Sequence, residues 1–179
     1  MLQIPKLDAA QRQLDCAIEL WFHDKDPVSV HTLVAAAYEI VHAVMQKQPN
    51  PAELYFDTAF IKDENREEFV AFVRKPANFF KHGNRDPHAT LDFHPVSSML
   101  FVIHAEKGLR KLGKPTSYAA QALVFWLTLH EPQWIREESR EALTKSLHVE
   151  EIAALRELGK AEFFKKYIES RVRLAARGT

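Results

Sequence analysis

The amino-acid sequence predicts an all-α fold: a single domain, residues 1–179, built as a helical bundle of six to seven helices. Only five of the 179 residues are Gly, and the abundant Ala, Leu, Glu and Lys are good helix formers. Apolar residues recur at spacings of three and four, and no stretch alternates with period two. Hydrophobic residues make up 46% of the chain, which is enough to bury a full core.

Two helices are predicted in the first fifty residues. The first covers residues 7–22, where one face carries the apolar residues Leu7, Leu14, Ile18, Trp21 and Phe22. The junction "HDKDPVSV" follows. Asp26 is the expected N-cap there, and Pro27 suits the first helical position because its missing N–H would have no partner anyway. The second helix is Ala-rich and should extend to about residue 48.

Prolines interrupt the helical pattern in the middle of the chain, from "PNPAEL" onward. A third helix is expected over residues 63–74. Pro76 should interrupt it, because its ring clashes with the preceding turn and it donates no hydrogen bond. One or two more turns at residues 77–82 should end at Gly83 and Asn84. The stretch "RDPHATLDFHP" should be a loop with a short extended piece at residues 90–93.

The last part of the chain is again predicted to be helical. Pro95 should start a helix to about residue 112, and "GKPTS" separates it from a helix at residues 117–130. The segments "WIREESREALTKSL" and "VEEIAALRELGKAEFFKKYIESRVRLAA" complete the chain as helices, with Gly159 as a break. No repeat and no long linker divides these elements.

Charge and targeting signals favour a cytoplasmic protein that does not enter a membrane. The formal net charge is zero, so no global field favours nucleic acid or anionic lipid. Residues 1–60 carry a net −4 and residues 61–179 a net +4. No signal peptide and no run of eighteen apolar residues is present. Cys16 is predicted to be a buried small hydrophobe in a reducing compartment.

The common cofactor motifs are absent from the sequence. It contains no GxxxxGK[ST], no GxGxxG and no GxSxG. One cysteine cannot form a cysteine-based zinc site. We therefore expect no cofactor.

Two sets of residues have side chains that can bind a metal. Glu39 and His42 form an ExxH pair on one helix face, but a ferritin-like site needs a second such pair, which the chain lacks. The other set is His23, Asp24, Asp26 and His31, in which the carboxylates are better explained as helix caps. We expect no metal. The sequence leaves open whether His23, His31, His42, His88 or His94 binds one.

The stretch "ANFFKHGNRDPHATLDFHP", residues 77–95, concentrates histidine and other polar residues among aromatic ones. On a helix, Asn78 and His82 point the same way, Arg74 precedes Asn78 by four, and Phe79 and Phe80 should face the core. Such a row could hold a phosphate. The predicted ligand-binding residues are Arg74, Asn78, Lys81, His82 and Arg85. The alternative is a solvated helix end at residues 81–86.

The segment "ANFFKH" resembles the signature of the HEPN superfamily of small helical bundles. Many members are metal-independent endoribonucleases, others bind nucleotides or RNA, and they commonly dimerise. Asn78 matches the polar position of the motif and His82 its histidine, whereas the catalytic arginine position falls on Ala77. Arg74 could replace that arginine only if a bend at Pro76 brought it round. The resemblance implies His82 as the catalytic residue if the protein is an enzyme.

The whole chain, through "DPVSVHTLVAAAYEIVHAV" and "NFFKHGNRDP", is also similar to a group of bacterial proteins of unassigned function. We expect a non-enzymatic module that binds a nucleotide, RNA or a protein partner through residues 74–94. The alternative is an enzyme: a divergent ribonuclease using His82, or a metal-dependent hydrolase using the His-rich stretch. The Ala-rich second helix, with twelve Phe and three Trp in the chain, predicts a homodimer.

Overall fold

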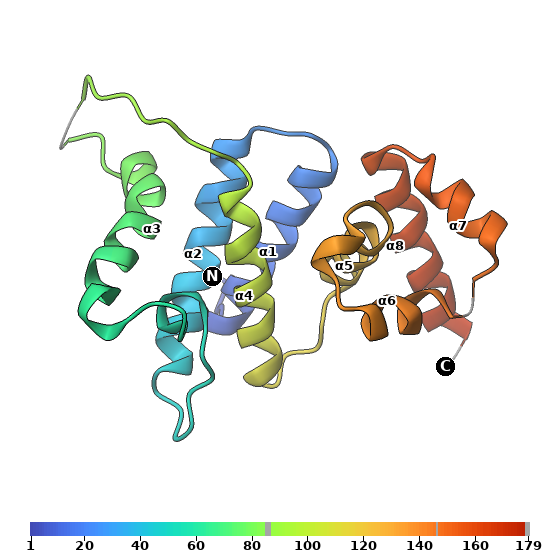
Figure 1. Cartoon of the computed structure of the whole chain (residues 1–179), viewed down its shortest axis with the longest axis horizontal. Coiled ribbons are helices and arrows are strands. Elements are labelled where there is room, and N and C mark those ends of the chain that lie inside the picture. The colour runs from blue at the N-terminus through green and yellow to red at the C-terminus, as the bar shows by residue number, and fades with distance from the viewer. Residues whose placement is uncertain (85–86, 146, 178–179) are drawn as a thin grey trace. The chain divides into compact units, whose positions relative to one another are not determined.

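The computed structural model describes residues 1–84, 87–145 and 147–177, and in these ranges it confirms the all-α fold (Figure 1). Eight α-helices and three short 3-10 helices occur there, and no strand. The count exceeds the predicted six to seven. The break at Gly159 separates two helices at the C-terminal end, and a third, short one precedes them. Arg85, one of the predicted ligand-binding residues, lies outside the described residues.

The chain was predicted as a single domain, and its backbone clusters into two compact units, which are described in turn. The first unit comprises residues 1–21 and 25–116, and the second comprises residues 22–24 and 117–179. The first contains the segment that the sequence singled out. The second is formed almost entirely by the C-terminal third of the chain.

The first unit is built around α2 (Pro27–Met45), which packs against both α3 (Arg66–Lys81) and α4 (Ser97–Lys111) (Figure 1). The N-cap prediction is confirmed, since the Asp26 carboxylate accepts from the backbone N–H of Ser29 at 2.9 Å and that of Val28 at 3.4 Å. Pro27 occupies the first turn as predicted. The buried residues of α2 are Val30, His31, Val34, Ala35, Ala37, Tyr38, Val41 and Met45.

By length and composition, α2 would also be able to cross a membrane. It has 19 residues with a mean hydropathy of 1.4, and 44% of that window is buried inside the protein. The core helix of a soluble protein has the same properties, so α2 is weak grounds for a membrane protein. The absence of a membrane segment stays a prediction.

Helices α2 and α4 approach closely at Gly108. A Cβ atom added there would clash with Val41 Cγ1 and lie 3.2 Å from Leu54 Cδ1. Val41 is β-branched and fully buried near the C-terminal end of α2, so its side chain has little freedom to move away. Glycine at this position therefore sets the separation of the two helices.

We expect Gly108→Ala to lower the free energy of unfolding by about 1–2 kcal/mol, because overpacking outweighs the better helix propensity of Ala. The measurement is urea unfolding followed by circular dichroism. Gly83→Ala is the matched control, because nothing lies within 4 Å of a Cβ at that position. If the two variants were equally stable, the close approach at Gly108 would not set the separation of α2 and α4.

Helix α3 continues through Pro76, and the predicted interruption is wrong. The lost hydrogen bond is the one that Phe72 O would accept from residue 76. Phe72 is 74% exposed, so water can reach this part of the helix. Val73 and Ala77 on either side are buried. Their packing holds the residues before and after Pro76 against the rest of the first unit, so the helix continues past the proline.

Helix α1 (Lys6–Phe22) also departs from one expectation, because Cys16 is exposed. The buried positions of α1 include Ala10, Leu14, Ala17 and Ile18. Cys16 lies two residues, about 200°, from Leu14 on the helix circumference. The cysteine therefore falls on the outer face, and the prediction of a buried thiol is wrong.

The second unit contains α5 (Tyr118–His130), α6 (Glu137–Thr144), α7 (Val149–Arg156) and α8 (Lys160–Arg177). Helix α5 packs against the other three. Ser117 caps α5 by accepting from Ala120 N–H at 3.1 Å. An aromatic cluster fills the core, in which the Phe22 ring lies 4.7 Å from Phe164, 6.0 Å from Trp126 and 6.1 Å from Phe163. The end of α1 thus belongs to this core.

Candidate functional site

Arg74, the first residue of the predicted row on α3, faces α2. Its Nε lies 3.3 Å from Glu39 Oε1, and its guanidinium lies 4.6 Å above the ring of Phe56. Cation–π contact and ion pairing hold the side chain in a half-buried position. Arg74 is therefore paired with a carboxylate of the first unit, and its part in an anion site with Asn78 and His82 stays a prediction.

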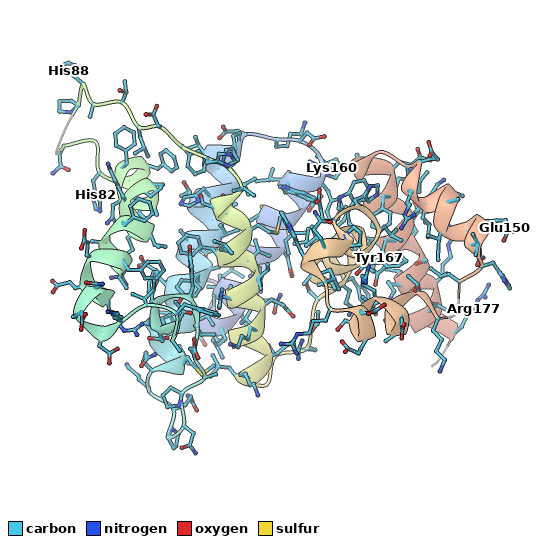
Figure 2. All side chains as sticks on the ribbon, viewed as in Figure 1. His82, His88, Glu150, Lys160, Tyr167 and Arg177 are labelled. Atoms are coloured by element: carbon cyan, nitrogen blue, oxygen red, sulfur yellow. The ribbon has the colours of Figure 1, made fainter. Side chains whose placement is uncertain are left out.

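The other described residues of the row are accessible. Asn78 is half-buried, and Lys81 and His82 are exposed. His82 ends α3, with its N–H donating to Asn78 O at 3.1 Å, and Figure 2 shows it at the end of that helix. His88 lies farther along the connection to α4 (Figure 2). Asn78, Lys81 and His82 therefore lie at the C-terminal end of α3.

The prediction that Phe79 and Phe80 are both buried is wrong for Phe79. Phe79 is 37% exposed and Phe80 is half-buried. The buried residues Val73 and Ala77 set the inward face of α3, and Phe80 follows Ala77 by three on that face. Phe79 lies about 200° from Ala77 and so points outward. Ala77, at the arginine position of the HEPN signature, is only 1% exposed.

The structure places a pocket on a different face of α3, beside the chain that enters α4. This aromatic pocket has a volume of about 240 Å³. Its walls include four aromatic residues, Tyr55, Phe72, Phe93 and Phe101, and its polar residues are Lys75, Asp92, His94 and Ser97. Lys75, Asp92 and His94 are exposed, whereas Phe101 is only 2% exposed. The pocket therefore has an apolar floor and a polar rim.

The ring of one rim residue, His94, accepts a hydrogen bond from the backbone. Val96 N–H donates to His94 Nδ1 at 3.4 Å, and Ser97 Oγ–H donates to His94 O at 2.9 Å. A neutral imidazole that accepts at Nδ1 carries its proton on Nε2. His94 can therefore donate a hydrogen bond from Nε2 to a ligand.

A buried histidine anchors the floor of the aromatic pocket. The His31 ring makes edge contacts with Phe93 at 5.0 Å, Phe101 at 5.5 Å and Phe80 at 5.8 Å. Its Nδ1 lies 3.0 Å from Ser98 Oγ, and its Nε2 has no hydrogen-bond partner among the described residues. Burial lowers the pKa of His31 to about 4. Neutral His31 thus joins α2, α3, α4 and residue 93 in one aromatic cluster.

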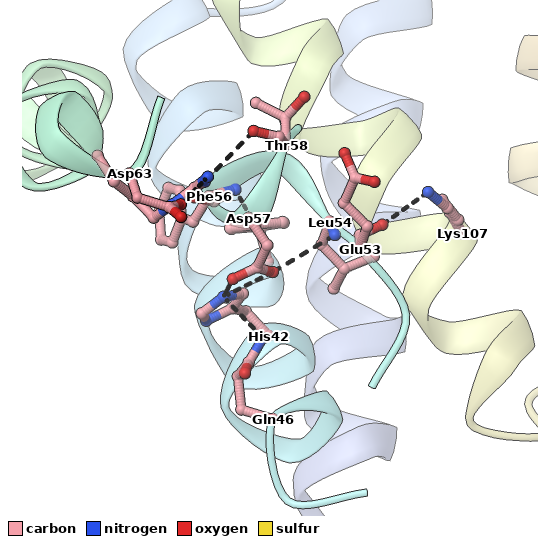
Figure 3. A network of polar contacts seen from close by, with 11 residues as sticks. His42, Gln46, Glu53, Leu54, Phe56, Asp57, Thr58, Asp63 and Lys107 are labelled. Atoms are coloured by element: carbon pink, nitrogen blue, oxygen red, sulfur yellow. Dashed lines mark hydrogen bonds and ion pairs between the residues drawn. The ribbon is translucent and has the colours of Figure 1, made fainter. Parts of the chain in front are cut away.

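The candidate ExxH residues have separate partners. Glu39 pairs with Arg74, whereas His42 Nε2 lies 3.1 Å from both carboxylate oxygens of Asp57 (Figure 3). Asp57 also accepts from Leu54 N–H at 3.4 Å. These hydrogen bonds hold residues 54–57 against α2. These contacts explain Glu39 and His42 as structural residues.

The junction histidines and carboxylates are also engaged separately. Asp26 caps α2, and Asp24 pairs with Lys160 at 2.7 Å. His23 lies edge-on to Phe164, and His31 is buried. In the three described ranges, no three His, Cys, Asp or Glu side chains come together as a metal site would require. That the protein binds no metal stays a prediction.

Tyr55, Phe72 and Phe101 lie outside the predicted surface 74–94, whereas Lys75 lies inside it but was not among the predicted ligand-binding residues. Leu91 and Phe93, both half-buried, gave a usable signal, because two apolar residues alternate with polar ones in a segment predicted to be a loop. Such a pair indicates a loop that packs against a helix.

We compared the chain with family models, curated proteins and solved structures, and none of them matches it. The functional argument therefore depends on the geometry of the site.

Proposed function

We propose that the first unit is a non-enzymatic module that binds a nucleotide, either free or as an unpaired residue of RNA, in the aromatic pocket. The observation that carries this proposal is the combination of aromatic walls with a polar rim that holds one cation, Lys75, and one carboxylate, Asp92, in one pocket. Each of the nucleobases can stack on aromatic side chains, and each stacked base contributes about 1–3 kcal/mol to the binding free energy. Lys75 supplies a charge for the phosphate.

The polar rim fits the same ligand. The Asp92 carboxylate can accept from the exocyclic amino group of a base, and His94 Nε2–H can donate to a ring nitrogen or a phosphate oxygen. Phe72, which is 74% exposed, provides a face at the entrance. Exposing an aromatic face to water is costly, and a stacked base would cover it.

A catalytic role for His82 is less well supported. The arginine position of the HEPN signature is Ala77, whose burial in the first unit leaves no room for a guanidinium there. Arg74, the proposed substitute, pairs with Glu39 and packs on Phe56. A ribonuclease that uses the 2′-hydroxyl needs a stabilising cation beside its histidine. Nucleotide binding in the aromatic pocket does not require Ala77 or Arg74 to move.

We expect adenosine monophosphate to bind with one site per chain by isothermal titration calorimetry. Phe72→Ala should weaken binding about tenfold by removing a stacking face. Phe60→Ala is the matched control, because Phe60 is 97% exposed and does not line the pocket. Both residues are exposed, so neither change should alter stability by more than about 0.5 kcal/mol.

The contribution of the phosphate is tested with a second pair of variants. Lys75→Gln should weaken adenosine monophosphate about fivefold and leave adenosine unchanged, and its effect should shrink at high salt. Lys81→Gln, on the same helix but outside the pocket, should have no effect. Equal effects of the two lysine variants would contradict the proposed site. Cleavage of RNA that is lost in His82→Ala would favour the ribonuclease instead.

A further inference from the structure

A second hollow lies wholly within the second unit, and we call it the α8 groove. It has a volume of about 490 Å³, within the size range of small-molecule sites. Its apolar lining comes from α5 to α8 and the connection between α6 and α7, and consists of Phe125, Leu143, Leu147, Leu155, Phe163 and Leu174. Tyr167 lies on the same face of α8, and Figure 2 shows its place in this unit.

The charge of the α8 groove is of one sign. Among the described residues that line it, the charged side chains are Lys166 and Arg171. Lys166 Nζ pairs with Glu162 at 2.9 Å, on the exposed surface of α8. A groove with an apolar lining and two cations, one of them already shared, is complementary to an apolar ligand with a single negative charge.

Arg171 is the stronger anchor of the two. Its guanidinium carbon lies 5.7 Å from the centre of the Tyr118 ring, which fixes the half-buried side chain. Its Nε is buried and has no hydrogen-bond partner among the described residues. A guanidinium has further N–H donors beyond Nε, and a ligand carboxylate in the groove would accept hydrogen bonds from these.

The rim of the α8 groove leaves apolar surface in water. Leu174 is 57% exposed and Leu143 is 39% exposed, on α8 and α6 respectively. Both line the groove. An alkyl chain lying between them would remove that surface from water.

We propose that the α8 groove binds a single-chain amphipathic carboxylate, of the fatty-acid class. Its alkyl chain lies along Phe125, Leu143 and Leu174, and its carboxylate accepts hydrogen bonds from Arg171 near Lys166. This site is in the second unit and does not depend on nucleotide binding in the first.

The probe is dodecanoate below its micelle concentration, titrated into the full chain by isothermal titration calorimetry, with dodecanol as the uncharged ligand of equal length. We expect one dodecanoate per chain and at least tenfold weaker binding of dodecanol, which lacks the charge. Arg171→Gln should weaken dodecanoate about tenfold and leave dodecanol unchanged. The matched control is Arg173→Gln, because Arg173 is exposed, pairs with Glu169 and lies outside the groove.

The apolar half of the site is tested with Leu174→Ser and Val172→Ser. Both residues are exposed on α8, but only Leu174 lines the groove. Leu174→Ser should weaken both ligands about fivefold, and Val172→Ser should weaken neither.

Three results would overturn the proposal. They are no saturable binding of dodecanoate, equal losses in the two arginine variants, and a dimer that Leu174→Ser dissociates without any binding of dodecanoate. The last result would identify a second copy of the chain as the occupant of the groove.

Discussion

Phe22→Ala should lower the free energy of unfolding of the second unit by about 3–5 kcal/mol, the cost typical of removing a buried phenyl ring. Phe22 is fully buried, and its ring contacts Phe163, Phe164 and Trp126. The remaining aromatic rings are too rigid to fill the space, so a cavity would persist. Trp126 is part of the same cluster, so its fluorescence should report the loss during urea unfolding.

Phe60→Ala serves as the control for this prediction. Phe60 is 97% exposed, so its removal should change the stability by less than about 0.5 kcal/mol. A small effect of Phe22→Ala, similar to that of Phe60→Ala, would show that the end of α1 is not part of the core of the second unit.

Acid should destabilise the first unit through His31. Burial lowers the pKa of this residue from 6.5 to about 4, so the folded state binds its proton less readily than the unfolded chain. The side chains in contact with it are Phe80, Phe93, Phe101 and Ser98, none of which is charged. The neutral form therefore contributes full stability above pH 6.5, and this contribution falls as the pH drops towards 4.

The expected loss at pH 4 is about 3 kcal/mol relative to pH 7, since one pKa unit corresponds to about 1.4 kcal/mol. Urea unfolding at several pH values measures it. His31→Gln should be less stable at pH 7 but should lose much less stability on acidification. His82→Gln, at an exposed position, is the control and should retain the slope of the original protein. An unchanged slope in His31→Gln would assign the acid sensitivity to other groups.

Local patterns were sufficient to predict most helices. The predicted helix at 117–130 is α5, the Asp26 cap and Pro27 start α2, and Gly159 separates α7 from α8. In each case, a periodic apolar face and a neighbouring cap or breaker determine the element. No contact distant in the sequence is needed to find them.

The position of Cys16 follows from the helical phase of α1, but the other errors have a different origin, because they depend on long-range packing. Pro76 was expected to end a helix, and the burial of Val73 and Ala77 overrides its local cost. Phe79 was placed inside, and that same inward face turns it outward. The pairing of Arg74 with Glu39 joins two helices and has no signature in a single sequence. The aromatic pocket likewise needs residues from four separate segments.

The exposed thiol of Cys16 has a practical consequence for measuring the oligomeric state. It is the only cysteine of the chain, and exposed thiols oxidise in air. Two chains joined through it would form a covalent pair that imitates the predicted homodimer in light scattering. Samples must therefore be kept reduced, or Cys16 replaced by Ser. The same thiol offers a single attachment point for a fluorescent or spin label at a known position on α1.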